Sequence, residues 1–564
     1  MEECSDMTDD VAIDIEVPFL VVGAGPTGLT LAKLLANADR GCLVVERSGG
    51  PQPNPSAHVV NARTLEIFRQ AGFDMNAIHA IAQDPLDSGH VNFVTRLNGE
   101  LIGRLPFERQ GDECLAVTPT PLRNISQHRL EPLMAGEITN AANVELRYAT
   151  EWVSATQDDL GVTSVLRDVT TGAEITVRSS YLLGADGAGS AVRKSLGINM
   201  IGPVSIQDFV AVHFLANLRP FIADRLGVLH FVMDPEVGGT LIAHDLDREW
   251  VFMYPYDAAS EEIDDQERER VVEILHGAIG TDEVEVDVVR VGTWHMTAQV
   301  AERFGQGRVL LAGDAAHRFP PTGGMGLNTG VADAHNLVWK LVAVEEGWAA
   351  PRLLDSYEVE RKPIAETNCH QSVTNAFKMI LLAEALGLHP GSSSSDLAAV
   401  LADPDRAEQI RAGVEDQATH FDMLGLQLGF IYGEGALVRD GDLPAPIDDP
   451  GLFEPSGEVG SRLPHGWLDD GRSTLDLIGS DAMTLLTFGD HEYWGASITG
   501  SQVPVRQLRI GRDVVVPDEW CINFGPSADG AMLVRPDQHI AWISDEASRR
   551  STDALSTALA TILS

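Results

Sequence analysis

Apolar runs and helical patterns alternate along the first part of the chain. The run Phe19–Val22 is typical of a strand buried on both faces, and a glycine-rich turn and a helix-spaced pattern follow it. A second run, Cys42–Val45, comes one helix later. The alternation continues to about residue 205, with a less regular stretch at 80–125. It predicts an α/β fold built on a parallel sheet.

The pattern changes over residues 206–289. Short apolar–polar runs separated by Pro, Gly and Asp predict an antiparallel sheet inserted into the first domain. The runs are Phe209–Phe214, Gly227–Met233, Thr240–His244 and Trp250–Tyr254. A charged helix is predicted at Glu261–Gly277, and a long one at Gly330–Glu346 after the chain returns to the first domain at 290–375.

The C-terminal part has a different composition. Residues 376–454 are alanine-rich and predict a helical segment and linker, with a polar break at Ser392–Ser395. Residues 455–564 contain predicted strands at Ala482–Phe488 and His539–Ile543 and a final helix, so we expect a separate domain.

Length and charge limit the function classes. A chain of 564 residues is expected to form two or three domains. Its 83 acidic and 40 basic side chains give a net charge of −43, which repels nucleic acid and anionic membranes. Residues 1–16 are acidic and predict a disordered tail. Because this segment lacks a basic n-region, it does not predict a signal peptide. No apolar stretch is long enough to span a membrane.

The five cysteines are scattered and form no CxxC pair. They predict neither a disulfide framework nor a zinc site, and they fit a reducing cytoplasm. No metal-ligand pattern is present, so no metal is expected.

The turn after the first strand carries the spacing of a dinucleotide-binding motif. Its first glycine allows a tight turn, its second lets a pyrophosphate approach the backbone, and its third lets helix and strand pack closely. An acidic residue ends the next strand, 18 residues after the third glycine, where a carboxylate can reach a ribose hydroxyl. The residues assigned to the cofactor on this basis are Gly23, Gly25, Pro26, Thr27, Gly28, Glu46 and Arg47.

Two later segments identify the dinucleotide by resemblance. Gly307–His317 resembles the segment with which glutathione-reductase-type flavoproteins hold the ribityl chain of FAD, here through Asp314. Tyr181–Arg193, with Asp186, resembles the Asp-Gly motif of flavoprotein aromatic hydroxylases, which is implicated in FAD and NAD(P)H binding. The motifs occur in family order over roughly residues 17–375. The chain resembles a single-component FAD-dependent aromatic hydroxylase, closest to the phenol and 2,4-dichlorophenol hydroxylase branch.

This resemblance implies the domain arrangement. A glutathione-reductase-like, FAD-binding Rossmann domain is expected at 17–205 and 290–375, with 80–125 partly in the substrate region. The sheet at 206–289 would bind the substrate. The segment from Gly460 to Leu477 resembles the thioredoxin-like tail of these hydroxylases. Without CxxC this domain is expected to be structural, at a contact within a homo-oligomer.

The resemblance also implies the reaction. NADPH or NADH would reduce non-covalently bound FAD, and O2 would form a flavin C4a-hydroperoxide that oxygenates a phenolic or hydroxylated heteroaromatic ring, usually ortho to the hydroxyl. The sequence does not choose between the two nicotinamides. One alternative is Baeyer–Villiger oxygenation of a polyketide ketone, and another is a non-catalytic flavin-binding scaffold. The intact loop from Pro320 to Gly330 argues against the scaffold.

Other flavin contacts are carried over by position. The loop after His317 would meet the flavin ring, with Pro320 near the reactive oxygen and Gly326, Leu327 and Asn328 along the ring. Arg63 resembles an arginine that contacts FAD and helps receive the nicotinamide. Gln127 resembles a glutamine near the ribityl and adenine side, and Arg129 is an alternative for which a surface salt bridge fits equally well.

His58 is the candidate base. It stands five residues before the Arg63 position, as a histidine does in the dichlorophenol hydroxylases. An imidazole with a pKa of ~6.5 can accept a phenolic proton at neutral pH. The inserted sheet offers further pocket residues, of which strand alternation directs only some inward. They are His213, His230, His244, Tyr254 and Tyr256.

Overall fold

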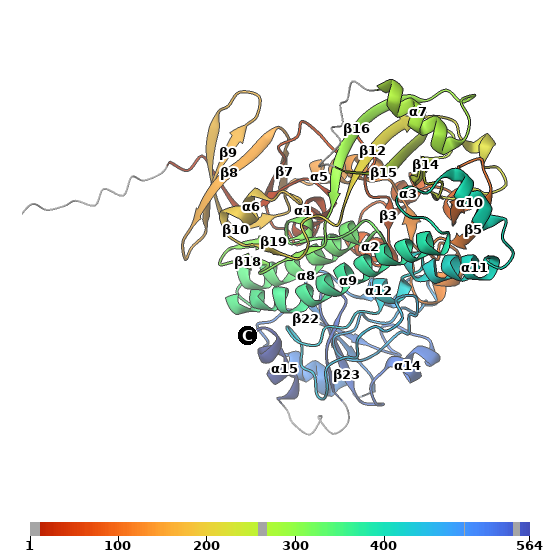
Figure 1. Ribbon diagram of the computed structural model, residues 1–564. Helices are drawn as coiled ribbons and strands as arrows, with labels where there is room; N and C mark the ends of the chain where they lie inside the picture. Colours follow the sequence, from red (N-terminus) through yellow and green to blue (C-terminus); the bar gives the residue numbers. More distant parts are fainter. Residues whose placement is uncertain (1–11, 258–267, 490, 545–552) are drawn as a thin grey trace, which may run out of the picture.

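A parallel sheet forms the centre of the first domain (Figure 1). The computed structural model describes residues 12–257, 268–489, 491–544 and 553–564. The parallel strands, in spatial order, are β7 (Val144–Arg147), β2 (Cys42–Val45), β1 (Ile15–Val22), β10 (Glu174–Gly184) and β19 (Val309–Leu311). β8 (Thr150–Gln157), β9 (Val162–Asp168) and β18 (Gly305–Gln306) extend the sheet by antiparallel pairs. Because β1 begins at Ile15, the predicted tail of 1–16 was too long at its end; residues 1–11 lie outside the described part.

Helices cover this sheet. α1 (Pro26–Asn37) and α5 (Gln127–Thr139) pack together, and α8 (Met325–Glu345) packs on α1. Leu29, Leu31 and Leu35 of α1 are fully buried in a core shared with the strands and α8. α2 (Ala62–Gln70) and the long α9 (Asp355–Ala385) lie against α8. The predicted α/β class is confirmed.

The second sheet has seven strands. In spatial order they are β16 (Asp287–Met296), β12 (Gln207–Leu215), β15 (Glu249–Tyr256), β14 (Gly239–Asp245), β13 (Leu229–Val232), β4 (His90–Val94) and β5 (Leu101–Pro106). Neighbours are antiparallel except β13 and β4, which are parallel. The strands that begin within 206–289 pair antiparallel with one another, as predicted, and the hairpin β4–β5 from the segment 80–125 joins their edge. β16 also continues past the expected boundary at 290.

The two faces of this sheet pack differently. α7 (Arg268–Ile279) covers one face, where Trp250 and Phe252 are buried. The start of the predicted helix Glu261–Gly277 lies outside the described residues. On the other face Phe93 stacks on Phe231, and Phe421 packs against both rings, beneath α9, α10 (Ser394–Leu401) and α11 (Ala407–Glu415).

The C-terminal domain lies below α8 and α9 in Figure 1. Its sheet has the order β22 (Val505–Arg509), β21 (Met483–Thr487), β23 (Ala531–Val534) and β24 (Ile540–Ser544). The first pair is parallel and the others are antiparallel, which is the arrangement of a thioredoxin fold. Its helices are α13 (His491–Ile498), α14 (Asp518–Phe524) and α15 (Ala554–Ile562).

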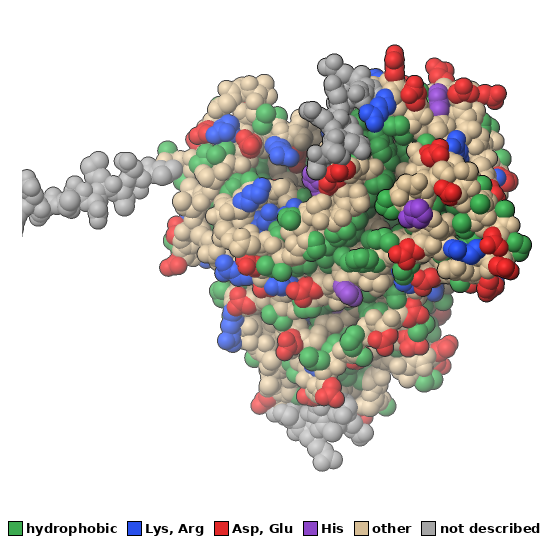
Figure 2. All heavy atoms as spheres, in the orientation of Figure 1, with side chains coloured by type: hydrophobic (Ala, Val, Ile, Leu, Met, Phe, Trp, Pro, Cys, Tyr) green, Lys and Arg blue, Asp and Glu red, His purple; other side chains and the backbone are tan. Residues whose placement is uncertain are grey.

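Short elements complete the described part of the chain. They are β3 (Val59–Val60), α3 (Met75–Ala80), α4 (Pro85–Ser88), β6 (Arg123–Asn124), α6 (Ala191–Ser195), β11 (Met200–Ile201), β17 (Gln299–Ala301), β20 (His317–Arg318) and α12 (Leu424–Leu428). Figure 2 shows acidic side chains over the visible face, including the lobe that carries α7. Within the ranges given above, no helix is both long and apolar enough to cross a membrane.

Candidate active site

The turn between β1 and α1 packs against the Asp-Gly segment. Gly23 has a φ of +106°, and a Cβ on it would lie 2.2 Å from the carbonyl oxygen of Ala185. A Cβ on Gly28 would lie 2.0 Å from the Gly23 carbonyl oxygen, so both positions require glycine. A Cβ on Gly25 would meet nothing within 4 Å. The backbone of Gly25 is therefore open to a ligand at the start of α1.

The two predicted carboxylates near this turn have different partners. Glu46 accepts hydrogen bonds from the Ala24 amide (3.1 Å) and the Ser48 amide. Asp186 accepts from the Ser190 hydroxyl (2.5 Å) and from amides at the start of α6. Arg47 is exposed beside Glu46. Glu46 thus reaches the glycine turn, while the carboxylate of Asp186 caps the next helix.

Asp314 lies beside the first turn of α8. Solvent reaches its carboxylate, while the protein packed around it raises its pKa through desolvation. None of the described residues forms a hydrogen bond with this carboxylate. A Cβ on Gly326 would lie 3.7 Å from its Oδ1. α8 begins at Met325, not Gly330 as predicted, because Gly324 adopts φ +61° and turns the chain into the helix.

The backbone that carries Asp314 is anchored by Asp333, which the sequence analysis missed. This buried carboxylate accepts from the Gly313 amide (3.1 Å), from His317 Nε2 (2.7 Å) and from Arg361 Nε (2.8 Å). Asp333 and Arg361 lie inside α8 and α9, where no motif marks them. The predicted Thr27 lies in α1, where its side chain packs closely against Gly313 and against Gly330 of α8. A Cβ atom on either glycine would clash with its hydroxyl.

These groups suit FAD. The open backbone of Gly25 and the uncapped start of α1 can receive a pyrophosphate. Asp314 offers an acceptor for ribityl hydroxyls, and the first amides of α8, which have no side-chain cap, can face the flavin ring at Gly326 and Leu327. Pro320 is buried in the connecting loop.

Three other predicted flavin residues use their side chains within the protein. Asn328 accepts from the Asn61 amide (2.9 Å) and the Thr64 hydroxyl (2.8 Å) and donates to the Val59 carbonyl (3.0 Å). Gln127 donates to Glu131 (2.6 Å). Arg63 is buried, and both of its terminal nitrogens are hydrogen-bonded to protein groups. For Asn328 only the backbone remains for a flavin contact.

His58 is held in one orientation at the substrate sheet. Its Nδ1 lies 3.0 Å from Asn124 Oδ1, and its ring stacks on Phe107 with centroids 6.3 Å apart. An amide oxygen only accepts, so with Asn124 in this orientation Nδ1 carries the proton and Nε2 keeps its lone pair. Burial lowers the pKa of His58, while the bond to Asn124 opposes that shift. The imidazole is therefore neutral at pH 7.

A histidine cluster surrounds this position, formed by His58, His128, His213, His244 and Glu249. The rings of His58 and His244 meet edge to face at 5.8 Å, and those of His244 and His128 at 6.2 Å. Glu249 lies 3.3 Å from His128 Nε2 and 3.2 Å from His213 Nε2. These contacts hold the pKa of Glu249 well below its ordinary value, although burial opposes them.

The structure separates the predicted sheet residues by face. His213 and His244 face His58. His230 and Tyr254 lie on the opposite face, in the core under α7, where His230 packs on Trp250 (6.0 Å) and Tyr254 on Phe252 (5.5 Å). The structure therefore places them, and Tyr256 with them, on the face away from His58, because alternate residues of a strand point to opposite faces. Asn124, His128 and Glu249 were missed, since only tertiary packing brings them to His58.

The fold and the site together define an FAD-dependent oxygenase. A family profile described as the FAD binding domain matches residues 16–372, and one described as aromatic-ring hydroxylase, C-terminal, matches residues 456–564. The chain belongs to the FAD-dependent aromatic-ring hydroxylases. It is a flavoprotein monooxygenase that uses FAD, O2 and a reduced nicotinamide.

Named relatives cover nearly the whole chain. The 2,4-dichlorophenol 6-monooxygenase of Cupriavidus pinatubonensis is 33% identical over 94% of both chains. Aklavinone 12-hydroxylase RdmE of Streptomyces purpurascens is 34% identical over 98% of this chain and 99% of its own. The crystal structure of the flavin-dependent monooxygenase PieE in complex with FAD and substrate has a TM-score of 0.91 at 34% identity, covering 97% and 100% of the two chains.

Proposed function

We propose that this enzyme hydroxylates a phenolic ring, either a simple phenol or a hydroxylated polycyclic aromatic, at the carbon ortho to the hydroxyl. The orientation of His58 by Asn124 carries the proposal, because it presents a neutral imidazole lone pair at the aromatic wall of the substrate sheet. The relatives named for 2,4-dichlorophenol and aklavinone support an aromatic substrate. Bound FAD would supply the redox chemistry that activates O2.

His58 would act on the substrate hydroxyl. Its Nε2 accepts the phenolic proton, which raises the electron density of the ring at the ortho and para carbons. Nδ1 keeps its own proton throughout, because Asn124 Oδ1 stays hydrogen-bonded to it. Phe107 packs on the imidazole and keeps its plane fixed. The pocket wall therefore selects a planar substrate with an ionisable hydroxyl.

The remaining cluster offers a route for the accepted proton. His244 is held at Nδ1 by the Ser126 hydroxyl (2.5 Å), and its ring lies between those of His58 and His128. Glu249 stays ionised and lies within ion-pair distance of His128 Nε2 and His213 Nε2. Arg129, half-buried, also donates to Glu249 (3.0 Å), so the cluster ends near the surface. The ionised carboxylate would attract a proton taken by His58 toward this side of the pocket.

Two arginines near the flavin segment suit the phosphates of the nicotinamide. Arg193 is buried and its Nη1 donates to the Ala315 carbonyl (3.1 Å). Burial and then the neighbouring charge of Arg318 lower the pKa of Arg193. In the described part of the chain neither arginine has an acidic group within ion-pair distance, and both Nε atoms are buried without a hydrogen-bond partner. Two adjacent cations that form no direct ion pair with a carboxylate favour an anionic ligand.

Product analysis tests the proposal. The purified enzyme with FAD, NADPH or NADH, and a panel of simple and polycyclic phenols should yield products one oxygen atom heavier, with labelled O2 and not labelled water as the source. Fragmentation should place the oxygen ortho to the original hydroxyl. A ring-expanded ester would show the Baeyer–Villiger alternative, and label from water would overturn the oxygenase assignment. Comparing NADPH with NADH in the same assay settles the nicotinamide, and light scattering tests the expected homo-oligomer.

A further inference from the structure

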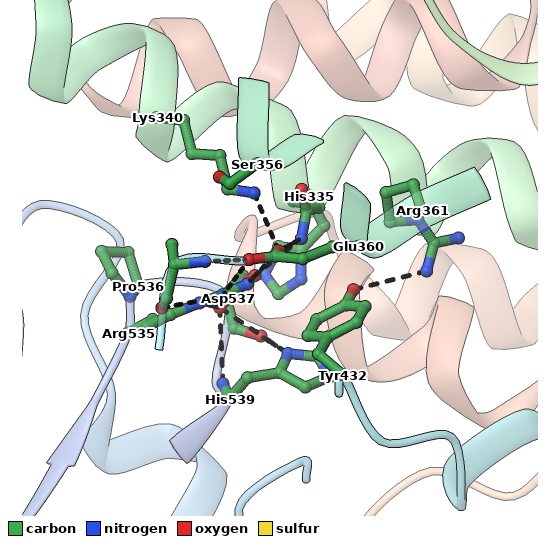
Figure 3. Close-up of polar contacts among 12 residues, drawn as sticks. His335, Lys340, Ser356, Glu360, Arg361, Tyr432, Arg535, Pro536, Asp537 and His539 are labelled. Atoms are coloured by element: carbon green, nitrogen blue, oxygen red, sulfur yellow. Dashed lines mark hydrogen bonds and ion pairs between the residues drawn. The ribbon is translucent and has the colours of Figure 1, made fainter. Parts of the chain in front are cut away.

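The turn between β23 and β24 belongs to the C-terminal domain but is buried against the FAD domain. It comprises Arg535–His539, and all of its side chains except that of Pro536 are at most 2% exposed. Gln70 of α2 donates to the Pro536 carbonyl (2.9 Å), and Asn336 of α8 donates to Asp537 Oδ2 (3.3 Å). Figure 3 shows this turn meeting residues of α8 and α9.

A network of four buried charges fixes the turn. Arg535 donates with both terminal nitrogens to Glu360 of α9 (2.7 and 2.9 Å), and Lys340 of α8 donates to the same carboxylate (2.8 Å). Arg535 also pairs with Asp537. The two cations and two carboxylates balance, which offsets the cost of removing them from water. This interdomain network sets the position of the turn relative to α8 and α9 (Figure 3).

The same turn holds Arg63 of α2. Arg63 Nη2 donates to the Asp537 carbonyl (2.9 Å), and Nη1 donates to Gln538 Oε1 (2.7 Å) and to Glu66 on its own helix (3.0 Å). Gln538 has a φ of +65°, a left-handed conformation that a glutamine keeps only where surrounding contacts hold it. The strained residue is thus the one that presents an acceptor to Arg63.

Arg63 also lies next to the start of α8. It lines a small cavity together with Gly324, Met325 and Asn328, at the end of the flavin loop. Its guanidinium is held there by two acceptors from the C-terminal domain, in addition to Glu66 and His335 of the FAD domain, to which the flavin loop also belongs. A change in the turn would therefore move the guanidinium relative to this loop.

We propose that the Arg535–His539 turn is a positioning element of the flavin site, and that Gln538 acts through Arg63. The two acceptors on the turn fix the plane of the guanidinium beside the flavin loop. This gives the C-terminal domain, which has no redox motif, a part in flavin chemistry. The inference rests on the contact of Arg63 with FAD that the family resemblance implies.

Matched substitutions at Gln538 test the proposal in the full-length holoenzyme. Gln538→Met removes the acceptor at similar side-chain length, while Gln538→Glu keeps an oxygen for Arg63. We expect Gln538→Met to raise the Kd of FAD, or to slow flavin reduction by the preferred nicotinamide, by about tenfold, since a hydrogen bond to a charged group is lost. The flavin midpoint potential should shift with it, and Gln538→Glu should restore both. Gln507→Met is the control, because the Gln507 side chain donates to Thr487 and to the His491 carbonyl within the C-terminal domain.

A double-mutant cycle with Arg63→Lys separates the possible failures. If Gln538 acts through Arg63, Gln538→Met should add little to Arg63→Lys. The proposal is overturned if Gln538→Met has the same effect in the wild-type and Arg63→Lys backgrounds. It is also overturned if Gln538→Met lowers only the thermal stability and leaves the potential and the Kd unchanged. Either result would show that the turn is purely structural. If Arg63→Lys itself leaves FAD binding, potential and reduction unchanged, the flavin contact of Arg63 is wrong, and the positioning role falls with it.

Discussion

The histidine cluster and the interdomain network are both buried polar groups, yet they are built in opposite ways. In the network each charge has an opposite charge within hydrogen-bond distance, and Glu360 alone accepts from Arg535, Lys340 and Asn336. In the cluster the imidazoles lie next to one another, buried at His213 and His244 and half-buried at His58 and His128, and desolvation lowers the pKa of His58 and His244. Two of its ring nitrogens, His128 Nδ1 and His213 Nδ1, have no hydrogen-bond partner among the described residues.

This difference separates a structural site from a reactive one. A balanced set of charges is stable because no group remains to be satisfied. Neutral imidazoles with free lone pairs can accept a proton, and they keep this capacity only while no permanent partner occupies them. Loss of a network residue should therefore reduce stability, and loss of a cluster residue should reduce rate.

The largest effect is expected from Glu360→Gln. This change leaves Arg535 and Lys340 buried with too little negative charge, so the free energy of unfolding should fall by ~3–5 kcal/mol. Urea denaturation followed by fluorescence measures it. Glu408→Gln is the control, because Glu408 pairs with Arg411 on the exposed surface of α11 and should cost less than ~1 kcal/mol. If both variants lost the same free energy of unfolding, the buried network would be no more stabilising than an exposed ion pair.

His58→Ala should reverse the pattern, with rate lost and stability kept. Hydroxylation should slow by ~100-fold or more, because a positioned base is removed, while FAD stays bound. Uncoupled peroxide release should rise, and the deficit should shrink as the pH approaches the pKa of the phenol, where solvent supplies the phenolate. Stopped-flow and product assays measure these quantities. A wild-type rate across neutral pH would make His58 a packing residue and place the base elsewhere.

His244→Asn and His230→Asn compare buried histidines on opposite faces of one sheet. Replacing His244 should slow hydroxylation roughly tenfold, because the proton accepted by His58 loses its route. Replacing His230, which bonds to the Gly227 carbonyl (3.1 Å), should cost ~1–2 kcal/mol of stability and leave the rate per folded molecule nearly unchanged. Similar rate losses in both variants would refute the assignment of faces.

The smallest effect is a shift in pH dependence. Burial lowers the pKa of His58 below the ordinary histidine value of ~6.5. Its lone pair is therefore free at neutral pH, and hydroxylation should fall only when the pH drops below ~6.5. Asn124→Asp places a carboxylate at Nδ1, which stabilises the imidazolium and should move this limb upward by about one pH unit. The rate at saturating phenol between pH 5 and 8 measures the shift. A limb that moves downward, or does not move, would argue against His58 as the titrating group.

Local sequence rules were sufficient to predict the glycine turn and the flavin segment. Gly23, Gly25 and Gly28 have roles that follow from backbone geometry within six residues, and Asp314 stands in a continuous motif. The faces of the inserted sheet were not predictable in this way. His230 and His244 lie in similar apolar–polar runs, and only the position of α7 decides which face becomes the core.

The sequence by itself determined the fold class, the cofactor and the order of the domains, because these depend on hydrophobic periodicity and on motifs that neighbouring residues complete. The tertiary structure alone decided the partners of His58 and Arg63. Asn124 lies 66 residues from His58, and Gln538 lies 475 residues from Arg63. Contacts over such separations form only when whole domains pack, so the charge and orientation of these groups depend on packing that no local pattern specifies.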